Sequence, residues 1–116
     1  MARKIKKRNT SSINLTDSDI STLIYALSIM PSFDLDVPEV QQEINFQLCK
    51  SATLKFANNS PNLTLNEYRV VLSSLQGLVL ICQGELTADG ISLAEVQKYF
   101  FSANKLLATF EKILNN

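Results

Sequence analysis

The residues that could do chemistry are few, because this 116-residue sequence contains no histidine. Histidine is the commonest general base and the commonest side-chain ligand of zinc and haem iron. The groups left to move protons or attack a substrate are carboxylates, Lys, Tyr and two cysteines, Cys49 and Cys82. The cysteines lie far apart and form no Cys-x-x-Cys motif, so they do not indicate a redox or nucleophilic site. We therefore expect no catalytic residue and a protein that is not an enzyme.

The acidic residues and glycines give no sign of a cofactor or metal site. Asp34 and Asp36 could contact a cation, but two acids in a turn are more often solvated. Gly77, Gly84 and Gly90 are too scattered for a phosphate-binding loop or a dinucleotide fingerprint. A di-iron bundle would need Glu-x-x-His pairs, which a sequence without histidine lacks. We expect no cofactor-binding residue and no metal ligand.

Most acids have a structural explanation in a pattern that occurs four times. The pattern is an apolar residue, a capping residue, two further residues, an acid and another apolar residue; it occupies 15–20, 35–40, 63–68 and 91–96. The cap accepts a hydrogen bond from a free N–H of the first helical turn, and the acid reaches back to the cap. The flanking apolar residues close over the turn. The pattern predicts four helix starts, with the acids Asp19, Glu39, Glu67 and Glu95 used for capping.

Helix ends and apolar spacing complete the fold prediction. Pro31, the segment 58–61 and Gly84 stop the first three helices. The predicted spans are about 17–30, 37–58, 65–83 and 93–114. Apolar residues follow the spacing of bundle packing in each except 37–58, and the short connections favour antiparallel neighbours. We expect an all-α, antiparallel four-helix bundle formed by residues 14–116, preceded by a disordered basic tail, 1–13.

The charge is distributed unevenly along a chain whose net charge is zero. Residues 1–10 contain five basic residues and no acid, whereas residues 11–116 contain six basic and eleven acidic residues. Such a tail can contact phosphates, although no aromatic residue accompanies it to stack on bases. It could also fold onto the acidic body or simply be solvated. For nucleic-acid binding, the residues that would carry the function are Arg3, Lys4, Lys6, Lys7 and Arg8.

The third predicted helix is apolar on both sides, which leaves its second face without an obvious role. Gly77 inside a helix costs about 1 kcal/mol relative to Ala, which close approach of another backbone would explain. This helix is either central within its own chain or exposes a face to a second copy or another protein. For the second alternative, the predicted interface residues are Val70, Ser73, Ser74, Gly77, Leu80, Ile81 and, from the fourth helix, Phe101.

The remaining features favour a cytoplasmic interaction protein. No apolar segment follows the basic start, and the longest apolar run, 78–82, is far below the roughly 20 residues that span a bilayer. Both cysteines should then be reduced and buried. We expect a small accessory, regulatory, inhibitor or immunity protein of bacterial or phage origin that forms a homodimer or binds another protein. The alternative is a nucleic-acid accessory protein tethered by the tail.

Overall fold

A computed structural model describes residues 15–33, 36–58 and 62–115. Within these residues the chain forms α1 (Asp17–Ile29), the 3-10 turn η3 (Met30–Ser32), α2 (Glu39–Ala57), α3 (Leu65–Cys82), α4 (Leu93–Gln97) and α5 (Phe100–Asn115). The described part contains no β-strand, only an isolated bridge between Phe33 and Ala88. The all-α class is confirmed. The expected disordered tail, 1–13, lies outside the described residues.

Two of the four predicted capping boxes are present in full. At α1 the Thr16 hydroxyl accepts from the Asp19 N–H at 3.0 Å, and the Asp19 carboxylate accepts from the Thr16 N–H at 3.1 Å. Thr64 and Glu67 make the same exchange at α3, at 3.1 and 2.8 Å. At α4 only the first half is present, the Ser92 hydroxyl accepting from the following turn at 3.1 Å. Side-chain capping therefore sets three of the helix starts.

The predicted cap at Asp36 is wrong. The N-cap of α2 is Pro38, and no side chain caps this helix. A cap at Asp36 would make Val37 the first helical residue, but the ring of a following proline disfavours helical backbone at that position. The helix therefore begins at Glu39. Gly84, in contrast, has φ of 77° just after α3, which agrees with its predicted role as the residue that stops that helix.

The fourth predicted helix, 93–114, is interrupted at residues 98–99. The backbone N–H of Lys98 and that of Tyr99 bond three residues back, to Glu95 and Val96, which tightens the chain into a turn before α5. Two features accompany this turn. The Val96 side chain is fully buried, and the Tyr99 ring stacks on the Tyr25 ring with centroids 4.1 Å apart. Tertiary packing thus divides a segment whose local sequence predicts one helix.

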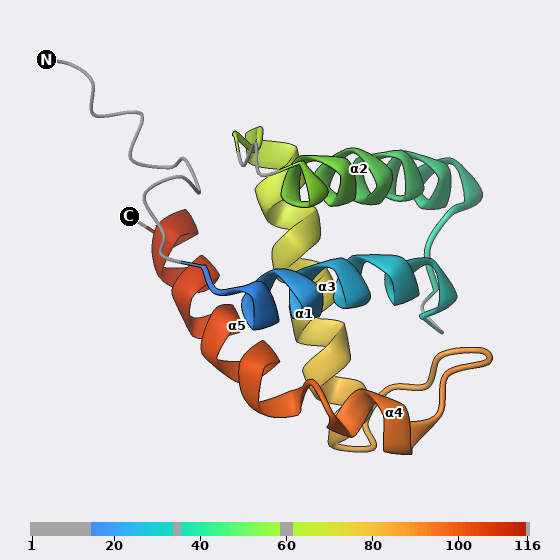
Figure 1. Ribbon diagram of the computed structural model, residues 1–116. Helices are drawn as coiled ribbons and strands as arrows, with labels where there is room; N and C mark the ends of the chain where they lie inside the picture. The colour runs from blue at the N-terminus through green and yellow to red at the C-terminus, as the bar shows by residue number, and fades with distance from the viewer. Residues whose placement is uncertain (1–14, 34–35, 59–61, 116) are drawn as a thin grey trace, which may run out of the picture.

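The helices cross rather than run as four antiparallel neighbours. α1 and α2 lie alongside each other, and α3 passes steeply across both (Figure 1). α5 packs along α3 and also contacts α1, and the short α4 packs on α3. The antiparallel four-helix bundle is therefore not confirmed. No helix in the described part of the chain has the length and apolar character needed to cross a membrane.

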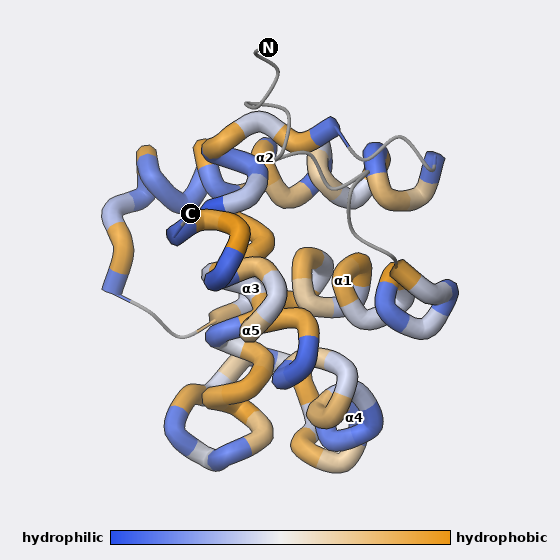
Figure 2. The backbone as a smooth tube through the Cα atoms, turned by 90° about the vertical axis from the view of Figure 1, so that its left-hand side faces the viewer, coloured by the Kyte–Doolittle hydropathy of each residue, from blue (hydrophilic) through white to orange (hydrophobic). Residues whose placement is uncertain are grey.

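α3 is the central element of the core. Ten of its residues are buried, compared with three of the nineteen residues of α2. Hydrophobic and hydrophilic segments both occur along α2, which lies at one side of the molecule (Figure 2). Of the two alternatives for the second face of the third helix, the structure favours the central position within the chain, because α1, α2, α4 and α5 all pack on α3.

Candidate functional site

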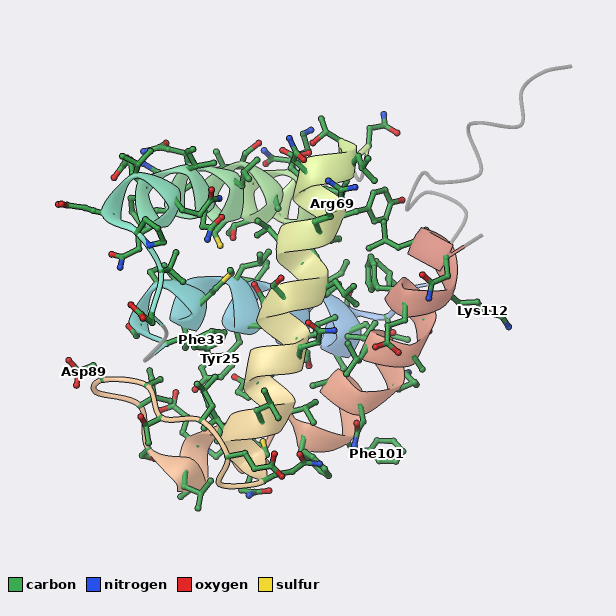
Figure 3. All side chains as sticks on the ribbon, turned by 180° about the vertical axis from the view of Figure 1, so that it is seen from behind. Tyr25, Phe33, Arg69, Asp89, Phe101 and Lys112 are labelled. Carbon is green, nitrogen blue, oxygen red and sulfur yellow. The ribbon has the colours of Figure 1, made fainter. Side chains whose placement is uncertain are left out.

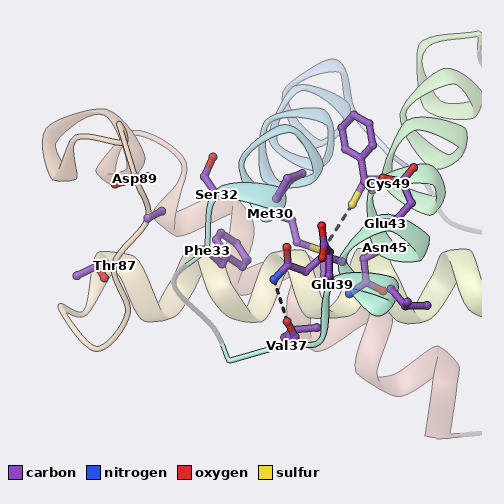
Figure 4. Close-up of a pocket in the computed structure, with 15 residues that line it drawn as sticks. Met30, Ser32, Phe33, Val37, Glu39, Glu43, Asn45, Cys49, Thr87 and Asp89 are labelled. Atoms are coloured by element: carbon purple, nitrogen blue, oxygen red, sulfur yellow. Dashed lines mark hydrogen bonds between the residues drawn. The ribbon is translucent and has the colours of Figure 1, made fainter.

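A hollow on the described surface lies between the end of α1, η3, the first half of α2 and the loop at 87–89. We call it the α1–α2 groove; its volume is about 1050 Å3 (Figure 4). The apolar side chains that line it are Met30, Pro31, Phe33, Val37, Val40, Phe46, Ala88 and Cys49. The polar ones are Ser32, Glu39, Gln42, Glu43, Asn45, Thr87 and Asp89.

The groove is open because the first half of α2 has little to pack on. Its first buried residue is Cys49, past the middle of the helix. Val40 and Ile44 continue the apolar line that ends at buried Ala52, yet they are 74% and 47% exposed. The second half, in contrast, is attached to α3 through a bond from the Lys55 ammonium to the Glu67 carboxylate at 2.7 Å. The first half of α2 therefore projects beyond the core.

The floor of the groove includes a ring that rests on a glycine. A Cβ atom at Gly77 would overlap the ring of Phe33. The absence of a side chain at this position thus admits the Phe33 side chain, and not another backbone as the sequence suggested. Beside it, the Met30 sulfur lies 3.6 Å from the Cys49 sulfur and 3.1 Å from the Ser74 hydroxyl. These contacts join η3, α2 and α3 under the groove.

Two hydrogen bonds define the walls of the groove. The backbone N–H of Asp89 donates to the Ser32 carbonyl at 3.0 Å, next to the bridge between Phe33 and Ala88, so the loop after α3 is held against η3. On the opposite wall the Gln42 side chain donates to the Val37 carbonyl at 2.8 Å (Figure 4). The first wall thus joins two segments more than fifty positions apart in the sequence, 30–33 and 87–89.

The groove is acidic at its rim. Glu39 and Glu43, one turn apart on α2, and Asp89 supply three carboxylates, whereas no Lys or Arg is among the described lining residues. The negative potential of such a rim, above an apolar floor, favours a ligand with positive charge around an apolar group. Of the two acids that we expected to be solvated, Asp36 is exposed and outside this lining, and Asp34 is outside the described residues.

Burial raises the pKa of both thiols above the ordinary value of a cysteine. Burial raises the pKa of Cys49 to about 11, so this thiol is protonated near neutral pH. Burial also raises the pKa of Cys82, which is only partly buried. No group of three or more potential metal ligands of the His, Cys, Asp or Glu type occurs within the described ranges.

Two capping acids are more deeply buried than the sequence indicated. Asp19 and Glu67 are only 4% and 3% exposed, whereas the sequence assigned them only to capping at helix starts. Burial raises the pKa of each carboxyl, but hydrogen bonds outweigh it: from Thr16 and Lys105 to Asp19, and from Lys55, Ser51 and Thr64 to Glu67. Both pKa values are therefore lowered, which suits structural ion pairs.

The predicted interface residues are divided between the interior and the surface. The structure buries Val70, Ser74, Gly77 and Ile81 within the chain, and it leaves Ser73 exposed. Leu80 is 37% exposed and Phe101 is 84% exposed. The predicted nucleic-acid contacts, 3–8, lie outside the described residues. The α1–α2 groove itself was not predicted; the only sequence signal for it was the weak apolar pattern of 37–58.

Known proteins give no further guide to the site. Comparisons with protein families, curated proteins and solved structures find no match for this chain.

Proposed function

We propose that the protein is a non-enzymatic binding protein that recognises another protein through the α1–α2 groove. The observation that carries this proposal is the combination of an apolar floor with a rim of three carboxylates and no cation among its described lining residues. A hollow of this size in a small protein that leaves apolar residues exposed beside it is typical of an interaction surface. We place this activity in the cytoplasm, where both thiols would stay reduced.

The chemistry of the groove defines its partner. Phe33 and Val40 offer contact to an aliphatic or aromatic side chain, whereas the Lys50 ammonium lies 5.3 Å from the centroid of the Phe46 ring. Glu39, Glu43 and Asp89 would then lie beside Lys or Arg residues that flank this side chain. The proposed ligand is therefore a protein segment with one apolar anchor between basic residues.

A graded peptide panel tests the proposal with the full chain. The panel contains a fluorescent peptide with a Phe between lysines, the same peptide with Phe replaced by Ser, and one with lysines replaced by glutamates. We expect fluorescence anisotropy to show binding of the first peptide and at least about tenfold weaker binding of the others, a difference of about 1.4 kcal/mol. The double variant Glu39→Lys/Glu43→Lys should lose binding, and its control Glu85→Lys/Glu111→Lys, at acids outside the groove, should retain it. Equal binding by all peptides, or by both variants, would contradict the proposal.

The basic segment 3–8 supports a second candidate, a nucleic-acid accessory protein. Its five basic residues are enough for phosphate contact, and counterion release would make binding weaken steeply with salt. The test is a titration with DNA and RNA at two salt concentrations, comparing the full chain with one that lacks residues 1–11. Binding that needs the segment and falls with salt supports this candidate; no binding at low salt removes it.

A further inference from the structure

Phe101 is the most exposed of the large apolar side chains in the described residues, at 84%. It lies in the first turn of α5. A phenylalanine side chain is usually buried, so this exposure is unusual. Lys105 lies one turn further along α5 and is a close neighbour of Phe101, and Lys98 precedes Phe101 by three positions, in the turn before the helix. Lys112 continues this face of α5 one heptad further on, and Lys98 and Lys112 are in no ion pair among the described residues.

This surface offers what the groove is suited to bind. It presents an aromatic anchor between lysines, whereas the groove presents an apolar floor between carboxylates. Lys105 is partly engaged, since its ammonium lies 3.3 Å from Asp19, but its side chain is still 56% exposed. The shapes are also complementary, since the Phe101 ring projects from α5 and the α1–α2 groove is a hollow. The two surfaces are therefore complementary in charge, in hydropathy and in shape.

We propose that the occupant of the α1–α2 groove is a second copy of this chain, which inserts Phe101 and aligns Lys98 and Lys105 with Glu39 and Glu43. This proposal rests on the proposed function and specifies its partner. It also preserves the self-association that the sequence suggested, but moves it from the face of α3, which is largely buried within the chain, to two exposed surfaces.

The positions of the two surfaces determine the type of assembly. Phe101 and Lys112 point outward from α5 on one side of the molecule, and Phe33 and Asp89 lie on the opposite side (Figure 3). A two-fold dimer that used both contacts would need the two surfaces to face the same neighbour. Surfaces on opposite sides instead join copies head to tail, which produces a chain of molecules or a closed ring.

The experiment compares the full chain with three variants by analytical ultracentrifugation over a range of concentrations up to about 1 mM, because small interfaces give weak binding. Phe101→Ser removes the anchor and Glu39→Lys/Glu43→Lys disables the groove. Leu80→Ser is the matched control, since Leu80 is exposed but belongs to neither surface. We expect the wild type and Leu80→Ser to grow beyond dimers with concentration, and each of the other variants to stay monomeric. Circular dichroism confirms that all are folded.

Mixing the two disabled variants is the decisive step. The anchor variant keeps an intact groove and the groove variant keeps an intact Phe101, so the mixture should form heterodimers and nothing larger. A symmetric interface would not be restored in this way, because each partner would bring its own defect to the same patch. A mixture that stays monomeric, or a Phe101→Ser variant that assembles like the wild type, overturns the proposal.

The outcome also separates this proposal from the one on which it rests. If the wild type is monomeric throughout but binds the basic, Phe-containing peptide, the second copy is excluded as partner and the groove keeps its proposed function. If the wild type neither assembles nor binds this peptide, both proposals are wrong.

Discussion

Replacing Gly77 with alanine should destabilise the protein, although alanine is the better helix former. Position 77 is in the interior of α3, where alanine is favoured over glycine by about 1 kcal/mol. The new Cβ would overlap the Phe33 ring, which must then leave its place. The sign of the effect depends on whether the packing lost by this ring exceeds the gain in helix propensity.

The magnitude follows from the burial of Phe33. Truncating a fully buried phenylalanine to alanine costs about 3–5 kcal/mol. Phe33 is only partly buried, so displacement of its ring should cost about half as much, roughly 2 kcal/mol. The net effect of Gly77→Ala is then about 1 kcal/mol of destabilisation. In a Phe33→Ala background no ring is displaced, so the same substitution should stabilise by about 1 kcal/mol.

Urea unfolding followed by far-ultraviolet circular dichroism measures the four proteins of this double-mutant cycle, with an expected coupling of about 2 kcal/mol. Ser73→Ala is the control, because Ser73 is on the same helix but exposed. It should gain about 0.5 kcal/mol from helix propensity in both backgrounds. If Gly77→Ala stabilises the wild type as much as the Phe33→Ala variant, Phe33 does not rest on Gly77 and the description of the groove floor is wrong.

Three more substitutions or modifications give equally direct outcomes. The pKa of Glu67 is lowered in the folded state, because hydrogen bonds, chiefly from Lys55, outweigh the effect of burial. The ionised Glu67 therefore stabilises the fold above the unfolded-state pKa of about 4.3, and this stabilisation is lost as the pH falls through the folded-state pKa. Urea titrations at falling pH should show Glu67→Gln less stable at pH 7 and less sensitive to acid; equal acid sensitivity would refute this, and exposed Glu111→Gln is the control. With a pKa of about 11, Cys49 should react with iodoacetamide at pH 8 at least roughly 200-fold more slowly than in urea, as followed by peptide mapping; similar rates would contradict its burial. The Tyr25 hydroxyl is buried without a hydrogen-bond partner among the described residues, so Tyr25→Phe should leave the melting temperature unchanged or raise the stability by up to about 1 kcal/mol, and a large loss would reveal a partner.

Local interactions explain which parts of the fold could be predicted from the sequence. The capping boxes at Thr16 and Thr64 involve residues three positions apart, so their residue types are sufficient to identify them. Gly84 stops α3 for an equally local reason, its positive φ. At Asp36 the same residue pattern is present, but Pro38 two positions later prevents a helix start there.

Other features depend on contacts that no local pattern contains. The turn at 98–99 accompanies the stacking of Tyr99 on Tyr25, whose sequence positions are far apart. The α1–α2 groove needs Phe33 to rest on Gly77 and the loop at 87–89 to lie against η3. The exposed position of Phe101, in contrast, could be predicted from the sequence, because an apolar residue off the core-facing stripe of its helix is expected to be exposed; its role in an interface stays a prediction.

The weak attachment of the first half of α2 has a consequence for the dynamics of the protein. Amide hydrogens exchange with solvent through local openings, whose free energy is lowest where few side chains are buried. Residues 39–48 contain no buried side chain, so their amides should exchange long before those of α3. One wall of the groove is thus formed by a helical segment that should open more readily than α3. A partner that binds only when residues 39–48 are folded would slow exchange of their amides in proportion to its concentration divided by its dissociation constant. Amide protection in this half of α2 would therefore report occupancy of the groove residue by residue.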